Sequence, residues 1–260
     1  MSQSATEIEA HAAGAPGGLS LAGVTRVLGG RPVLDGLSLD VPAQTRVGIV
    51  GRSGAGKSTL LSLVAGHDDP DEGVVTVAGA STRAGRLARC VLMSQRDCLL
   101  PWRSAIDNAC LALENRGLRR GDARRQAVPL FERLGLAGAE GLRPSQLSGG
   151  MRQRVALART LLSGKDVLLL DEPFGALDAI TRAELQEWLL TVLADEPRTV
   201  ALVTHDVEEA LLLCDAVVVL RDGRIRLALE PEFGRNRPRR AIVTSHEFVE
   251  LRERALEAIG

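Results

Sequence analysis

A glycine-rich segment near residue 55 has the residue types and the spacing of a phosphate-binding loop. It matches the pattern GxxxxGK[ST] and follows an apolar stretch at residues 46–50. Glycines let backbone N–H groups turn inward around phosphate oxygens, and the helix expected after the loop adds a favourable dipole. The predicted phosphate-binding residues are Gly51, Arg52, Ser53, Gly54, Ala55, Gly56, Lys57, Ser58 and Thr59.

Three side chains of this loop have distinct expected roles. Lys57 would reach the β and γ phosphates, the Ser58 hydroxyl would bind Mg²⁺, and Thr59 would contact an α phosphate oxygen. Lysine is rare in this chain, since only Lys57 and Lys165 occur among 32 basic residues. Taken alone, the loop indicates a nucleoside triphosphate and leaves kinases, GTPases, helicases and transporters open.

A carboxylate pair, Asp171 and Glu172, directly follows the apolar residues 167–170. A buried strand that ends in charge is costly without a ligand. Asp171 suits the Mg²⁺ shell through water, and Glu172 suits a general base that orients the attacking water toward the γ phosphate. Without the upstream phosphate loop, the pair could equally be a solvated strand end.

A second anion-binding helix start is predicted at residues 147–155. Ser148 is the expected N-cap, and Gly149 and Gly150 follow it. Because a compact site already has its own phosphate loop, this helix start is best explained by ATP bound to another copy of the chain. The alternative is an ordinary capped surface helix.

The predicted elements place these residues in an α/β fold. Strands are expected at residues 19–24, 37–41 and 46–50 with an antiparallel arrangement, then a helix to residue 65, strands at 74–77 and 91–94, and helical stretches over 106–134. A helix to 162, strand 167–170, helix 180–193, strand 199–203, helix 207–213, strand 216–220 and helix 247–258 follow. Strands that alternate with helices imply a mostly parallel sheet, which binds ligands at the carboxyl ends of its strands.

Composition narrows the function classes. With 33 acidic and 32 basic residues, the formal charge of −1 gives no global electrostatic argument for nucleic-acid binding. The apolar runs fall well short of the roughly 18 residues that a membrane-spanning helix needs. Residues 1–18 are interpreted as a disordered tail without an export signal. The four cysteines lack CxxC spacing, which favours reduced, buried thiols over zinc or disulfides.

Together with Gln95, Ala176-Leu177-Asp178 and His205, these motifs resemble the ATPases of the ABC transporter family over roughly residues 19–223. The resemblance implies a P-loop NTPase core with an antiparallel β subdomain and a helical signature subdomain at about residues 96–160. A C-terminal tail and helix would occupy residues 224–260. The implied cofactors are ATP and Mg²⁺.

The resemblance also assigns roles to single residues. It makes Glu172, His205 and Gln95 the catalytic residues, with His205 at the γ phosphate. Gln95 would additionally touch Mg²⁺, beside Ser58 and Asp171, and would sense the membrane subunits. Asp178 would contact the opposite subunit, as Ser148, Gly149 and Gly150 would contact its ATP.

Two positions depart from the family pattern. An aromatic residue usually stacks on adenine near Val27 and Leu28, yet this chain has no tyrosine and only aliphatic groups there. The family commonly has glycine where Gln44 stands, which predicts a different turn before the phosphate-loop strand.

The implied assembly is an importer. It comprises a homodimer of ATPase subunits, two transmembrane permease subunits and a solute-binding receptor, with this chain peripheral on the cytoplasmic face of the cell membrane. The segment Leu99-Leu-Pro-Trp102 is interpreted as the permease-docking loop, with packing inside the helical subdomain as the alternative. This segment, the Asp107-Asn108 pair, Met151 and the tail at residues 237–259 resemble the nitrate, taurine and aliphatic sulfonate importers, and aliphatic sulfonates are the first expectation. A soluble ABC ATPase acting on DNA or ribosomes is disfavoured, because the coiled-coil insertions, zinc cysteines and fused cassettes of those relatives are missing.

Overall fold

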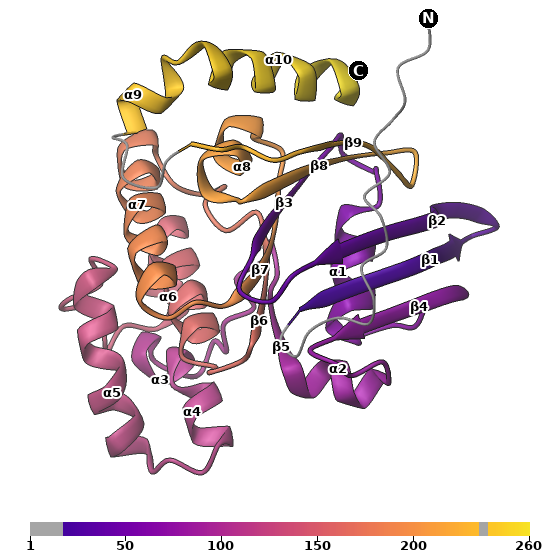
Figure 1. Ribbon diagram of the computed structural model, residues 1–260. Coiled ribbons are helices and arrows are strands. Elements are labelled where there is room, and N and C mark those ends of the chain that lie inside the picture. Colours follow the sequence, from indigo (N-terminus) through magenta and orange to yellow (C-terminus); the bar gives the residue numbers. More distant parts are fainter. Residues whose placement is uncertain (1–17, 234–238) are drawn as a thin grey trace, which may run out of the picture.

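The computed structural model of the protein describes residues 18–233 and 239–260. Apart from Gly18, the predicted tail lies outside the described residues. Figure 1 shows a central sheet with helices on one side and, on the other, a small second sheet together with further helices. Within the described part of the chain, no helix is long and apolar enough to span a membrane.

The central sheet has six strands in the order β5-β6-β7-β3-β8-β9. They are β3 (Arg46–Val50), β5 (Cys90–Met93), β6 (Val167–Asp171), β7 (Thr199–Thr204), β8 (Ala216–Arg221) and β9 (Arg224–Leu229). All neighbours pair in parallel except β8 and β9, which form an antiparallel hairpin at one edge. The predicted mostly parallel sheet is therefore confirmed.

Apolar residues cover both faces of this sheet. Along β6, Val167 and Leu169 belong to one buried cluster, while Leu168 and Leu170 belong to the other. Burial on both faces explains why the inner strands read as continuous apolar runs rather than as alternating patterns. One cluster lies beneath α1 (Lys57–Ala65), and the other packs against α6 (Gly149–Leu161), α7 (Ala179–Asp195) and α8 (Val207–Leu213).

The second sheet consists of β1 (Leu19–Leu28), β2 (Arg31–Val41) and β4 (Glu72–Val77), in the order β2-β1-β4. Both pairings are antiparallel, as predicted for the start of the chain. One part of that prediction is wrong, because β3 pairs in parallel with β7 and β8 at the centre of the main sheet. The short helix α2 (Arg83–Arg89), which the sequence analysis did not predict, connects β4 to β5.

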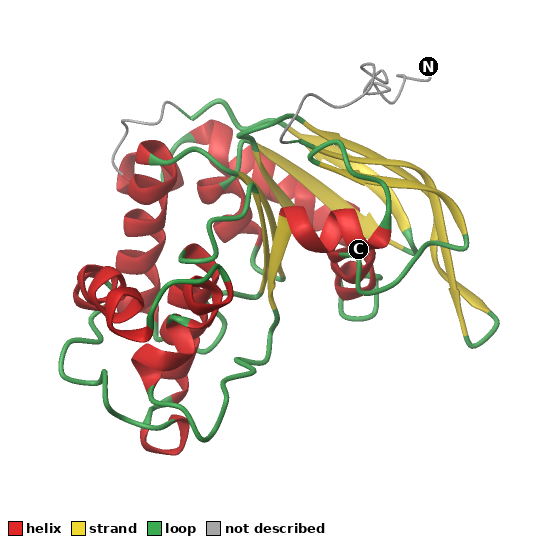
Figure 2. Cartoon of the chain, turned by 90° about the horizontal axis from the view of Figure 1, so that it is seen from below, coloured by secondary structure: helices red, strands yellow, loops and turns green. Residues whose placement is uncertain are grey.

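The middle of the chain forms a helical region. It contains α3 (Ala105–Ala109), α4 (Leu111–Asn115), α5 (Arg120–Arg133), the 3₁₀ helix Pro144–Gln146 and the start of α6. The helical stretches expected over residues 106–134 are thus three helices, with Gly117 at φ +91° in the connection before α5. Figure 2 shows these helices gathered on one side of the molecule, away from the antiparallel strands.

The C-terminal part completes the core. The short helix α9 (Arg239–Val243) precedes α10 (His246–Ile259), which packs against α8 and β8 through Phe248 and Ala255 (Figure 1). At the end of α10, the Gly260 carbonyl oxygen accepts a hydrogen bond of 3.1 Å from Arg52 Nη1 of the phosphate loop.

Two local expectations are corrected by the structure. Gln44 has φ +63°, the left-handed conformation that glycine favours, so the turn before β3 has a glycine-type backbone without glycine. The Gln44 N–H donates to Thr199 Oγ1 at 2.9 Å, which ties this turn to β7. The four cysteines are free as expected, but Cys98 is exposed rather than buried.

Candidate active site

The phosphate loop lies between β3 and α1 and depends on two glycines. A Cβ atom at Gly51 would lie 2.2 Å from the carbonyl oxygen of Leu220, closer than atoms can approach. Gly56 has φ +102°, and a Cβ there would lie 2.7 Å from the carbonyl oxygen of Val33. Only glycine fits at either position, and the loop can follow this path because both residues are glycine.

The start of α1 is suited to an anion. Gly56 is the N-cap and provides no side-chain oxygen, and the first turn of the helix contains no acidic residue. The first N–H groups of the helix therefore remain available, and the helix dipole favours negative charge at this end. Arg52, Ser53 and Gly54 are exposed, so this part of the loop is accessible to a ligand.

Lys57 folds back over this loop. Its Nζ donates to the carbonyl oxygens of Gly51 at 2.7 Å and of Arg52 at 2.9 Å. Burial lowers the pKa of the Lys57 ammonium, against the opposing effect of nearby Glu172 and Asp171. The ammonium thus lies between the loop and the two carboxylates, where phosphate oxygens could replace the carbonyl oxygens as its partners.

Asp171 and Ser58 form the other side of the site. Ser58 Oγ donates to Asp171 Oδ2 at 3.2 Å, which brings the ends of β6 and the phosphate loop together. Burial raises the pKa of the Asp171 carboxyl, and Glu172 adds to this effect. A buried carboxylate beside a hydroxyl is an oxygen donor set that suits Mg²⁺.

Glu172 and His205 follow neighbouring strands and meet at the same edge. The Glu172 N–H donates to the Val203 carbonyl oxygen at 2.9 Å, and His205 Nδ1 lies 2.6 Å from Glu172 Oε2. The structure therefore brings Lys57, Ser58, Asp171, Glu172 and His205 together, because β3, β6 and β7 are adjacent in the sheet.

The remaining predicted residues lie beside this cluster. Ser148 is the N-cap of α6 and accepts from the Met151 N–H at 3.2 Å, as predicted. Gln95 and Gly149 line a cavity of about 360 Å³ together with Ala176. Asp178 is exposed and caps α7 through the N–H groups of Ile180 and Thr181. That Ser148 and Asp178 serve the ATP site of another copy stays a prediction.

The side chains expected to support the adenine ring are aliphatic and exposed. Val27 and Leu28 are 42% and 45% exposed at the end of β1, just before Gly29 and Gly30. The Val27 N–H donates to Asp71 Oδ2 at 2.6 Å, which fixes the end of the strand.

Sequence reasoning missed several contacts around the site. Asp97, two residues after Gln95, pairs with Arg152 of α6 at 2.9 Å. Gln153 of α6 contacts the backbone of the loop after β6. Both residues lie in or near recognised motifs, but the sequence contains no signal for the partner that each contacts.

The fold and the arrangement of these residues define a P-loop nucleoside triphosphatase. Residues 34–175 match the family model described as ABC transporter. The chain is 49% identical over 222 residues to the aliphatic sulfonates import ATP-binding protein SsuB 1 of Rhodococcus jostii, covering 85% of this chain and 86% of that protein. It is 45% identical over 233 residues to the taurine import ATP-binding protein TauB of Chromobacterium violaceum, covering 87% and 88%.

A solved structure gives the same result. The dimeric bacterial ABC transporter cassette MJ0796 superposes with a TM-score of 0.77 at 28% identity, covering 83% of this chain and 100% of the cassette. The same cassette has also been solved in a post-hydrolysis state bound to ADP and Pi, with a TM-score of 0.76 at 28% identity and the same coverage of both chains. The chain belongs to the ABC transporter family, as an ATP-binding subunit that hydrolyses ATP.

Proposed function

We propose that this subunit energises an importer of aliphatic sulfonates, with taurine as the second candidate solute. The observation that carries the proposal is the 49% identity with a relative named for aliphatic sulfonate import. In such importers the receptor and the permease select the solute, so the proposal rests on this relative rather than on a solute site in the chain. Nitrate import, and action on nucleic acid or ribosomes, have no comparable support.

In the proposed reaction, the chain binds ATP and orients water for hydrolysis. Ser58 and Asp171 would hold Mg²⁺, whose charge would stabilise the phosphate oxygens. Lys57 and the N–H groups of Gly51 to Thr59 would bind the phosphates. Glu172 would orient and deprotonate the attacking water, and His205, within hydrogen-bonding distance of Glu172, would hold that carboxylate in place.

The proposed active unit is a homodimer with two composite sites. Ser148, Gly149 and Gly150 at the start of α6 would bind the ATP of the partner subunit. The exposed Asp178 would lie at the contact between the subunits, near Ile180, an apolar residue that is 74% exposed in the single chain. The dimeric cassette with the same fold supports this arrangement.

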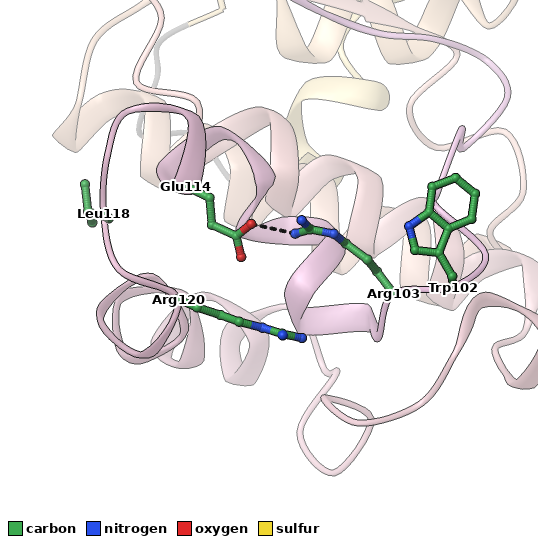
Figure 3. A pocket seen from close by; sticks show the side chains of 5 residues that line it. All are labelled: Trp102, Arg103, Glu114, Leu118 and Arg120. Atoms are coloured by element: carbon green, nitrogen blue, oxygen red, sulfur yellow. Dashed lines mark hydrogen bonds and ion pairs between the residues drawn. The ribbon is translucent and has the colours of Figure 1, made fainter.

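The proposed permease contact centres on Trp102, on the cytoplasmic face of the membrane. Its side chain is 69% exposed, whereas Leu99, which the sequence analysis placed in the same docking segment, is 8% exposed and packs internally. Figure 3 shows Trp102 and Leu118 at opposite ends of a hollow of about 560 Å³, with the ion pair of Arg103 and Glu114 between them. An exposed aromatic at the rim of a hollow is typical of a protein interface.

Reconstitution tests this function. The chain would be co-purified with a candidate sulfonate permease and placed in liposomes that contain MgATP. Uptake of labelled ethanesulfonate, taurine and nitrate would then be measured with the matching receptor. We expect ATP-dependent uptake of ethanesulfonate; uptake of nitrate alone, or ATPase activity that responds to nucleic acid but to no permease, would refute the proposal.

A further inference from the structure

Gln153 of α6 bridges two backbone groups of the loop that follows β6. Its Nε2 donates to the Glu172 carbonyl oxygen at 2.7 Å, and its Oε1 accepts from the Ala176 N–H at 2.9 Å. The side chain is buried, with 8% of the residue exposed. A single amide thus closes a ring across the turn from Glu172 to Ala176.

This turn has a strained first residue. Glu172 has φ +52°, a left-handed conformation that non-glycine residues adopt only where their surroundings enforce it. The Gly175 N–H also donates to the Glu172 carbonyl oxygen, at 3.2 Å. Two hydrogen bonds to one oxygen hold the peptide plane after Glu172, and that plane sets the direction in which the Glu172 side chain leaves the backbone.

Glutamine is the side chain that fits this position. The bridge needs one N–H donor and one acceptor at the end of the same side chain, and a primary amide supplies both. Methionine would fill a similar volume with neither group. Glutamate would keep the acceptor for Ala176 but would place a negative oxygen against the Glu172 carbonyl.

The same helix carries Ser148 and Gly150 one turn earlier. A Cβ atom at Gly150 would lie 2.9 Å from Leu177 Cδ2, so the start of α6 also packs closely against the segment that leads to Asp178. A displacement of α6 would therefore act on Glu172 and Ala176 through Gln153, and on Leu177 through Gly150.

We propose that Gln153 is a positioning residue that sets the backbone of Glu172 and thereby couples the start of α6 to the hydrolytic carboxylate of the same subunit. Gln153 touches neither phosphate nor water in this role. The inference rests on the proposed function of Glu172 as the general base.

The test compares Gln153→Met and Gln153→Glu with Thr160→Val. Thr160 is a matched control, because it is also buried on α6 and, among the described residues, its hydroxyl donates to the Ala156 carbonyl oxygen of the same helix. Both Gln153 variants should lose at least about tenfold in kcat for ATP hydrolysis, with KM and the calorimetric Kd for ATP within about twofold of the unchanged chain. Thr160→Val should keep kcat even if its melting temperature falls.

A second arm uses a Glu172→Gln background. Adding Gln153→Met there should lower the residual rate by less than twofold, because the carboxylate that Gln153 positions is already absent. An unchanged kcat in folded Gln153→Met and Gln153→Glu would overturn the inference, and so would equal losses in Thr160→Val. If Glu172→Gln itself hydrolyses ATP normally, the assignment of the base fails first, and that result is independent of Gln153. If Gln153→Met does not fold, the kcat of the more polar Gln153→Glu variant decides whether the inference holds.

Discussion

His205 Nδ1 lies 2.6 Å from Glu172 Oε2, although the two residues are far apart in the sequence. The contact exists because β6 and β7 are neighbours and both residues follow the carboxyl ends of their strands. Glu172 is mostly buried in this pair, while the His205 side chain is largely exposed. The imidazole can therefore reach a ligand from the open side without disturbing the carboxylate.

Replacing Glu172 by Gln should reduce hydrolysis by at least about a hundredfold while ATP binding is retained. The amide keeps the shape of the side chain but removes the negative charge that orients water. Phosphate release and titration calorimetry would measure the two effects. Glu184→Gln, an exposed change on α7, is the control. Near-normal turnover in Glu172→Gln would exclude this residue as the base.

The composite site predicts an ATP-dependent dimer. Glu172→Gln protein with MgATP should elute as a dimer in size exclusion, because bound ATP persists and joins the two subunits. Adding Ser148→Arg should abolish that dimer by placing bulk and charge at the start of α6. Ser81→Arg, on the exposed connection before α2, should leave the dimer intact. A dimer that survives Ser148→Arg would argue against the composite site.

Trp102→Glu should prevent co-purification with the permease and leave ATP binding unchanged, because the side chain contributes its exposed face to the interface rather than to the core. Leu87→Glu provides a matched control, since Leu87 is an exposed apolar residue on α2. Leu99→Glu should behave differently and destabilise the fold, because Leu99 is buried. Unfolding of Trp102→Glu would favour a packing role instead.

The aliphatic side chains at Val27 and Leu28 predict weaker adenine binding than in relatives with an aromatic residue there. Without a ring at Leu28, a stacking contribution of about 0.5 to 1.5 kcal/mol is lost, and GTP should compete with ATP comparatively well. Leu28→Tyr should tighten ATP binding by about two- to tenfold in titration calorimetry. Val27→Tyr tests the neighbouring position. If neither folded variant tightens binding, another residue supports the base.

Glu209 predicts a pH-dependent stability. Burial raises the pKa of this α8 carboxyl to about 7, Thr204 opposes the shift, and Asp206 adds to it. Between the unfolded value of 4.5 and about 7, the folded state holds a proton that the unfolded state releases. The free energy of unfolding therefore falls as pH rises through this window, and the penalty persists above it.

Glu209→Gln removes this penalty. Relative to the unchanged chain, the variant should gain about 1 to 3 kcal/mol more at pH 8 than at pH 5, as measured by urea denaturation at both values. Glu208→Gln is the control, because Glu208 is part-exposed and pairs with Arg252. An equal difference at the two pH values would show that the buried carboxyl does not titrate in this window.

The sequence predicts well where the phosphate loop and the residues after β6 and β7 lie in the fold, for a physical reason. Strands β3, β6 and β7 are apolar on both faces, so they stand out as continuous runs, and polar residues that follow them must gather at one edge. The glycines of the phosphate loop are equally easy to recognise in the sequence. The close approach of the Leu220 carbonyl oxygen requires glycine at position 51, and the positive φ requires it at position 56.

Other elements could not be predicted, because their residue pattern resembles that of a loop. Strand β9 carries Arg224 and Arg226 on an edge of the sheet, so its charges hide its pairing with β8. Strand β2 begins with Arg31 and Pro32, which read as turn residues. Gln153 makes its contacts with backbone atoms. Almost every residue type has the same backbone groups, so the sequence of the partner segment does not reveal these contacts.

The scarcity of lysine gives the protein a built-in chemical reporter. Lys57 and Lys165 are its two lysines, and Lys165 Nζ lies elsewhere, bonded to the Ala88 carbonyl oxygen at 2.6 Å. The lowered pKa of Lys57 increases the fraction of its amine that is uncharged and nucleophilic. Mild acylation followed by mass spectrometry would therefore read occupancy of the phosphate loop at one peptide, with Lys165 as the internal standard, and no fluorophore or engineered residue would be needed.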